Sequence, residues 1–84
     1  DGWLDVDSTG DVTITVPADG TNSLTYPVGT SFDIFRANTG NVTITGSGAT
    51  VNGTPGLKLR ARYSSATLFK RSANSWVLIG DLTA

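Results

Sequence analysis

The sequence predicts an all-β fold: a small antiparallel β-sandwich or jelly-roll-like domain of about eight short strands, with essentially no helix. Turn residues interrupt alternating runs of Val, Ile, Thr, Leu and Phe about every 8–12 residues, a spacing typical of sandwiches and small barrels. No window carries the apolar stripe of an amphipathic helix. The 84 residues are enough for one domain.

The expected strands follow one another along the chain, each flanked by turn residues. They comprise residues 12–16, 23–26, 31–36, 41–45, 49–52, 57–63, 66–71 and 75–79. Tight turns or short hairpin loops are expected at residues 17–20, 46–48 and 72–74, and the dipeptide Asn52-Gly53 is the strongest turn signal. The chain therefore alternates strand and turn throughout.

The alternation also divides apolar residues between two faces of the strands. The residues expected in the core are Val12, Ile14, Val16, Phe32, Ile34, Val42, Ile44, Val51, Leu57, Leu59, Leu68, Trp76 and Leu78. Four further apolar residues lie on the opposite face of their strands: Phe35, Phe69, Val77 and Ile79. A strand that is apolar on both faces is either central in a sandwich or covered by a partner.

An eight-residue segment recurs thirty residues later in the chain. Residues 8–15 (STGDVTIT) and 38–45 (NTGNVTIT) are identical at six of eight positions. One interpretation is a two-repeat architecture with equivalent strands in each half. We favour the other interpretation, that similar turn and strand residues recur by chance in a Thr-rich β chain. The residues after the two copies differ, since Pro17 follows one and a glycine-rich hairpin follows the other.

The composition restricts the chemistry that the chain can perform. There is no His, Cys or Glu, so acid–base catalysis falls to Asp, Lys or Tyr, and no disulfide is possible. Asp5, Asp7 and Asp11 with Gly10 resemble the start of a calcium loop, but Val16 stands where the loop needs Glu. We expect no enzymatic activity, no cofactor and no metal site. Without disulfides or a metal, a domain this small is often stabilised by oligomerisation.

Charge is distributed unevenly along the chain. Residues 1–33 contain six Asp and no cation (−6), whereas residues 34–84 contain six cations and one Asp (+5). The candidate ligand or intersubunit contacts are an exposed aromatic residue and five cations: Trp3, Lys58, Arg60, Arg62, Lys70 and Arg71. Alternation along the expected strand 57–63 places three of the cations, Lys58, Arg60 and Arg62, on its outer face. It places Leu57, Leu59, Ala61 and Tyr63 on the buried face.

Each of these candidate sites has a second interpretation. The cations are either a patch for an anionic partner or a solvated face paired with acidic loops; a net charge of −1 and a pI near 4.9 argue against nucleic acid. Trp3 is either a platform for a sugar ring or, as we favour, an anchor for a terminal strand. No apolar run approaches the ~18 residues of a transmembrane helix, so no membrane insertion is expected.

The C-terminal two thirds of the chain resembles a known family. Residues 39–44, 49–53, 57–70 and 74–82, together with 26–30, resemble a small β domain of tailed-bacteriophage tail fibre and minor tail proteins. The most specific segments are residues 63–70 and 76–82. The likeness suggests a fibre-type domain over residues 24–84, with residues 1–23 as a strand or linker joined to it.

The resemblance implies a structural component of the virion, made in the host cytoplasm. Such a domain is often homotrimeric, contacts other virion proteins and serves assembly or attachment to host-surface glycan. Two alternatives remain open: a capsid decoration or head-fibre domain, and a carbohydrate-binding module of an extracellular enzyme.

Overall fold

The computed structural model describes residues 2–20 and 26–84. Within these ranges it contains strands and turns but no helix. The strands are β1 (Trp3–Val6), β2 (Val12–Pro17), β3 (Ser31–Arg36), β4 (Val42–Ser47), β5 (Thr50–Gly53), β6 (Lys58–Leu59), β7 (Ser65–Ser72), β8 (Ser75–Gly80) and β9 (Leu82–Thr83). The all-β prediction is thus confirmed, as is the absence of helix from the described residues. Accordingly, these ranges hold no helix able to cross a membrane.

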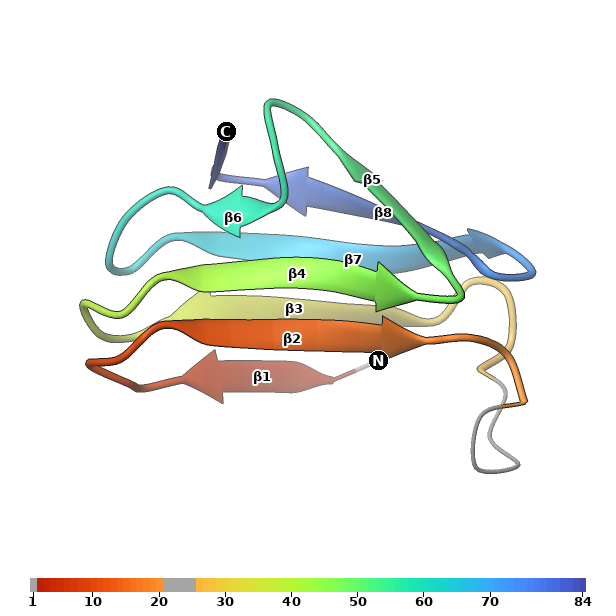
Figure 1. The fold of residues 1–84 in the computed structure, drawn as a ribbon, viewed down its shortest axis with the longest axis horizontal. Helices are drawn as coiled ribbons and strands as arrows, with labels where there is room; N and C mark the ends of the chain where they lie inside the picture. The colour runs from red at the N-terminus through yellow and green to blue at the C-terminus, as the bar shows by residue number, and fades with distance from the viewer. Residues whose placement is uncertain (1, 21–25) are drawn as a thin grey trace.

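The strands form two sheets, one behind the other in the view of Figure 1. One sheet has the order β1-β3-β7-β8-β5 and the other β2-β4-β6-β9. Three pairs are parallel: β1–β3, β2–β4 and β5–β8. The sheets are therefore mixed, whereas the sequence predicted antiparallel ones. The reason is that the first four strands alternate between the sheets. The chain therefore re-enters each sheet in the same direction.

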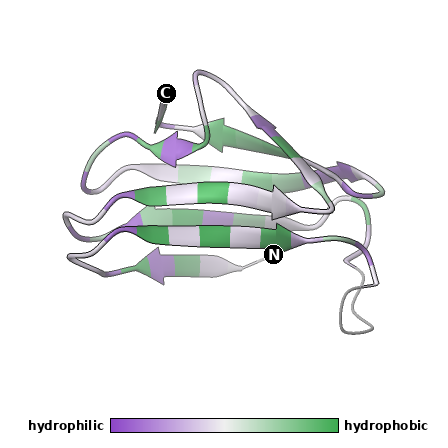
Figure 2. Cartoon of the chain, viewed as in Figure 1, coloured by the Kyte–Doolittle hydropathy of each residue, from purple (hydrophilic) through white to green (hydrophobic). Residues whose placement is uncertain are grey.

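The thirty-residue repeat is structural, which corrects the interpretation favoured from the sequence. Both β1–β3 and β2–β4 pair with an offset of thirty residues, for example Leu4 with Ile34 and Val12 with Val42. Figure 2 shows the same alternation of apolar and polar residues along β2 and β4. We call residues 3–17 the first rung and residues 33–47 the second rung. The two rungs stack in parallel.

The turns of the two rungs are joined by polar contacts. Asn38 donates from Nδ2 to Asp7 Oδ1 at 2.8 Å, and the Asn41 backbone N–H donates to Asp11 Oδ1 at 3.0 Å. The Gly40 N–H donates to the Ser8 carbonyl at 2.9 Å. The polar turn residues of the repeat thus hold the two turns together, whereas its Val and Ile residues face the core.

The expected strand 57–63 is wrong beyond Leu59. The Ala61 N–H donates to Ser64 Oγ at 3.0 Å and the Ser64 N–H to the Ala61 carbonyl, so the chain turns there. Such local hydrogen bonds compete with strand pairing. Tyr63 consequently takes a left-handed φ of 73° and is exposed, although alternation had placed it on the side of Leu59.

The other expected strands match to within one or two residues, apart from one. Residues 23–25 of the expected strand 23–26 lie outside the described residues. The short strand β9, at the C-terminal end of the chain, was not expected. Residues 1–23 were expected to be a strand or linker joined to the domain. Within them, β1 forms one edge of the five-stranded sheet.

The core lies between the two sheets. Its fully buried apolar members are Val16, Ile34, Val42, Ile44, Leu59, Ala66, Leu68, Trp76, Leu78 and Leu82. Ala66 and Leu82 were not expected there. The remaining expected core residues are half-buried: Val12, Ile14, Phe32, Val51 and Leu57.

Two cations are also buried in this interior. Arg36 donates to the carbonyls of Leu59, Thr39 and Asn38 at 3.2, 2.7 and 3.3 Å, and so joins the second-rung turn to β6. Lys70 is 1% exposed; its Nζ lies 2.6 Å from Asp19 Oδ1 and also donates to the carbonyl of Tyr26. Both side chains donate hydrogen bonds to backbone carbonyls of other segments, so we assign both a role in stabilising the fold.

Candidate binding face

A row of three aromatic rings lies on the outer face of the five-stranded sheet. The Trp3 and Phe35 rings stack with centroids 5.5 Å apart, and those of Phe35 and Tyr63 stack at 6.2 Å. Trp3 is 62% exposed and Tyr63 63%. We call Trp3, Phe35 and Tyr63 the aromatic row.

Local sequence explains the position of each ring. Trp3 and Phe35 point outward because their neighbours Leu4 and Ile34 point to the core, and successive side chains alternate along a strand. The Tyr63 N–H donates to the Arg36 carbonyl at 2.6 Å, which fixes the left-handed turn that presents the ring. A bulky residue in this conformation costs free energy, and such strain is concentrated at functional sites.

Polar groups flank the aromatic row. The Arg62 guanidinium lies 4.8 Å from the centroid of the Tyr63 ring, and its Nε donates to the Ala37 carbonyl. In register with Trp3 across the sheet, Thr67 donates to Asp33 Oδ1 at 2.7 Å. Exposed rings with hydrogen-bonding groups beside them form a surface that can bind a ligand with both apolar and hydroxyl faces.

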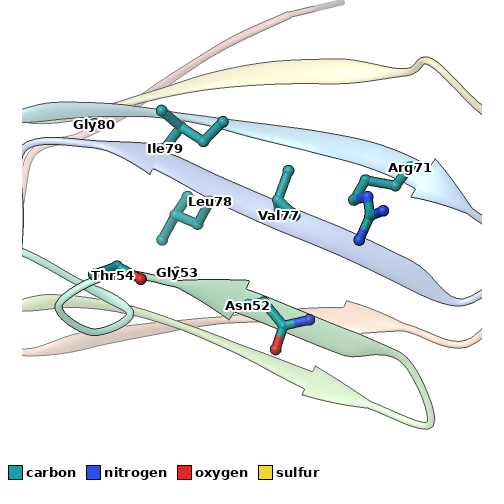
Figure 3. Close-up of a pocket in the computed structure, with 8 residues that line it drawn as sticks. All are labelled: Asn52, Gly53, Thr54, Arg71, Val77, Leu78, Ile79 and Gly80. Carbon is teal, nitrogen blue, oxygen red and sulfur yellow. The ribbon is translucent and has the colours of Figure 1, made fainter.

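A shallow hollow of about 660 Å³ lies over β5 and β8. Its wall includes Val77 and Ile79, two of the four residues expected on a second apolar face, with Asn52 and Arg71 beside them. Figure 3 shows the Arg71 side chain extending from β7 over β8 next to Val77. The hollow is thus apolar with polar groups at its rim, on the sheet face that carries the aromatic row.

The other two second-face residues, Phe35 and Phe69, also lie on this outer face. Phe69 is exposed and Phe35 half-buried, while Ile79 is 67% exposed. None of the four enters the core of the chain. The structure therefore has apolar surface outside its core, formed by the residues that the sequence assigned to a second face.

The structure does not gather the predicted cations into one patch. Lys70 points into the core and Arg71, the next residue, points to the outer face. Lys58 lies in the other sheet on β6, while Arg60 and Arg62 lie in the turn that follows it. Of the predicted contacts, Trp3 belongs to the aromatic row, Arg62 flanks it and Arg71 lies at the hollow.

Arg60 forms an ion pair with Asp81. Its Nε lies 2.6 Å from Asp81 Oδ1 and its Nη2 lies 2.9 Å from Oδ2, and Ser64 Oγ donates to Oδ2 as well. The hydrogen bond from Arg60, then that from Ser64, lowers the pKa of the Asp81 carboxyl below its ordinary value. This pair closes the turn that presents Tyr63, so it supports the aromatic row indirectly.

The Asp81 pair predicts a small acid-dependent effect on stability. The folded pKa is lowered, so the pair stabilises the fold above the ordinary aspartate pKa, and this contribution is lost as pH falls through the lowered value. We expect Asp81→Asn to melt at a slightly lower temperature than the wild type at neutral pH. Melting curves between about pH 7 and pH 2 should show the difference shrinking in acid; a constant difference would contradict the assignment.

Two acidic residues of the first rung take part in hydrogen bonds between the two turns. Asp7 and Asp11 accept hydrogen bonds from the second-rung turn, as described above. Among residues 2–20 and 26–84, no three carboxylates lie close enough to hold an ion.

Comparison of the chain with protein families, with curated proteins and with solved structures finds no significant match.

The sequence pointed to two of the three rings of the aromatic row but not to their arrangement. It named Trp3, and it placed Phe35 on a second face, but it assigned Tyr63 to the buried side of a strand. A hairpin turn was expected at Ser64-Ser65, because serine side chains favour turns. The structure begins the turn at Ala61, whose N–H donates to Ser64 Oγ, and Tyr63 therefore lies within the turn and not at the end of a strand.

Proposed function

We propose that this domain is a non-enzymatic module of a tailed-bacteriophage fibre or minor tail protein, and that it attaches to carbohydrate on the host surface. The observation that carries the attachment is the aromatic row. Three neighbouring rings on the outer side of the sheet, of which Trp3 and Tyr63 are more than half exposed, offer stacking positions for the C–H faces of sugar rings. The virion context is supported by the family resemblance over residues 24–82.

The polar groups around the aromatic row support a saccharide over a purely apolar ligand. The carboxylate of Asp33 and the hydroxyl of Thr67 lie beside the rings, where they can exchange hydrogen bonds with sugar hydroxyls. A mixed surface of this kind is also that of a carbohydrate-binding module of an extracellular enzyme. That alternative shares the same site and differs in the protein that carries it.

Loss of a ring from the aromatic row is expected to weaken glycan binding without unfolding the domain. We expect Trp3→Ala and Tyr63→Ala each to weaken binding on a glycan array by about tenfold or more, since an exposed stacking contact contributes about 1–3 kcal/mol. Thr50→Ala is the matched control, because Thr50 is exposed on β5, at the edge of the same sheet farthest from β1. Unchanged binding by both row variants, or equal loss by the control, would refute the proposal.

A second role, assembly with copies of the chain, is favoured by the apolar surface at the hollow. Phe69, Val77 and Ile79 leave apolar area on the outer face that a neighbouring subunit would cover. The family resemblance implies a homotrimer, and we assign this surface to the threefold contact. Capsid decoration would use the same kind of surface, and retention on empty capsids would distinguish it.

A further inference from the structure

The first rung is built like the second but is less covered. Leu4 is 42% exposed, whereas its register partner Ile34 is 1% exposed. Val12 and Ile14 are half-buried, whereas their partners Val42 and Ile44 are fully buried. The second rung is covered by the first, and no described residue covers the first in the same way. Figure 1 shows β1 and β2 together at one margin of the two sheets.

A cavity opens between the sheets at this margin. It has a volume of about 380 Å³ and a mainly apolar wall that includes Leu4 and Ile14, one from each sheet, with Val16 and Trp76 deeper inside. Leu4 lies two residues before the end of β1, and Ile14 lies two residues after the start of β2. The two residues are therefore level with each other across the sandwich.

The outer edges of both strands carry backbone groups without a ladder partner among the described residues. The carbonyls of Gly2 and Val6 accept from β3, so in a parallel ladder the alternate residues Trp3 and Asp5 direct their N–H and C=O groups away from it. The Val12 N–H donates to the Asn41 carbonyl of the second rung, so Thr13 and Thr15 likewise direct theirs outward.

These edges lack the usual protection against pairing. Natural edge strands are blunted by lysines, prolines or bulges. β1 and β2 contain no lysine or arginine, and their one proline, Pro17, lies at the end of β2. Both edges are therefore able to accept a further strand.

We propose that the first rung pairs with the first rung of a second copy of this chain. A twofold axis normal to the sheets, passing midway between the two copies of Leu4 and midway between the two copies of Ile14, places both strand pairs antiparallel at once. Trp3 then exchanges two backbone hydrogen bonds with Asp5 of the second copy, and Thr13 does so with Thr15. All outward groups of these four residues are used, and Asp5 faces a tryptophan and not another carboxylate.

Other arrangements of two copies satisfy the edges less well. A head-to-tail stack would place the first rung against β5 and β9 at the far edges, but β9 has only two residues and cannot match the six of β2. The twofold contact instead joins strands of equal length. It also brings the two aromatic rows end to end through their Trp3 residues, and it closes the cavity with Leu4 and Ile14 from both copies.

Cysteine crosslinking tests the contact cleanly, because the chain has no cysteine of its own. In the proposed register Leu4 lies opposite itself as a non-hydrogen-bonded pair, with Cα atoms about 4.5 Å apart, which is short enough for a disulfide. We expect L4C to form a disulfide-linked dimer at least about tenfold faster than T50C, because pairing raises the effective concentration of the thiols. Thr50 is exposed on β5, at the other edge of the same sheet.

The mass of the assembly gives a second readout that does not depend on the cysteine variants. With the threefold contact proposed above, the twofold contact joins two trimers, so light scattering is expected to show six copies for the unmodified chain and three for Asp5→Pro; without the threefold contact, the numbers are two and one. Asp5→Pro removes an outward N–H while leaving the bonds to β3. Equal crosslinking of L4C and T50C, or a monomer or trimer unaffected by Asp5→Pro, would overturn the proposal. Tyr63→Ala should leave both readouts unchanged, which separates this contact from glycan binding.

Discussion

Gly40→Ala is expected to lower the free energy of unfolding by about 3 kcal/mol, since a backbone clash that packing cannot relieve is among the most costly substitutions. A Cβ at Gly40 would lie 2.1 Å from the Gly10 carbonyl oxygen and 2.7 Å from that of Ser8. Those atoms are backbone of the first-rung turn, so they cannot move without separating the rungs. Urea denaturation followed by tryptophan fluorescence measures the loss.

Gly10→Ala is the matched control for this prediction. Gly10 occupies the same place in the first rung, thirty residues earlier, but a Cβ there would meet nothing closer than Ser8 Oγ at 4.0 Å. We expect its effect to stay within about 0.5 kcal/mol, as for an ordinary exposed site. Two equal losses would show that the turns do not stack and would remove the basis for the two-rung description.

The second large effect is expected at the buried pair of Lys70 and Asp19. Asp19→Ala leaves the ammonium group of Lys70 buried with the Tyr26 carbonyl and the face of Trp76, whose centroid is 5.9 Å away. Removing one partner of a buried ion pair typically costs about 3–5 kcal/mol. We expect the lower end, because a hydrogen bond and a ring contact remain.

Lys70→Met should be the milder change, although it alters the more deeply buried residue. Methionine is unbranched and fills the same channel, and the carboxylate of Asp19, with 23% of its side chain exposed, can hydrate. The expected loss is below about 1.5 kcal/mol. In the double variant the cost of Asp19→Ala should largely disappear. A Lys70→Met loss that exceeds that of Asp19→Ala would contradict this account.

The proposed surfaces make different demands on the same sheet. The aromatic row has to stay open to bind glycan, whereas the apolar hollow and the first-rung edge are proposed to be covered by other copies. Trp3 belongs to the row and also adjoins the edge, so the twofold contact would place two rows in line. A glycan long enough to span both copies would then bind with higher avidity than either row alone.

Much of the fold followed from local sequence patterns. Alternation in segments such as Val12–Pro17 and Ser31–Arg36 fixed the strands and their inward faces, because a side-chain period of two leaves one choice of core face. Charge alternation misled at residues 58–62. There the pattern fits a strand, but the hydrogen bonds of Ser64 with Ala61 make a turn instead.

The binding face was only partly predictable. Trp3 and the second-face residue Phe35 were visible as exposed or unassigned aromatic residues, but their stacking depends on the pairing of β1 with β3. Tyr63 joins them through a left-handed turn that no periodicity signals. The burial of Lys70 was equally hidden, because an alternating pattern does not say which connecting segment will supply a carboxylate.

The amino-acid sequence alone determined that this protein is an all-β domain, which residues of most strands face inward, and that apolar surface would remain outside. Only the tertiary structure decided that the two copies of the thirty-residue repeat stack in parallel, and that the aromatic rings meet on one face. The physical reason is that strand identity depends on neighbouring residues, whereas strand partners, register and direction depend on contacts between residues far apart in the chain.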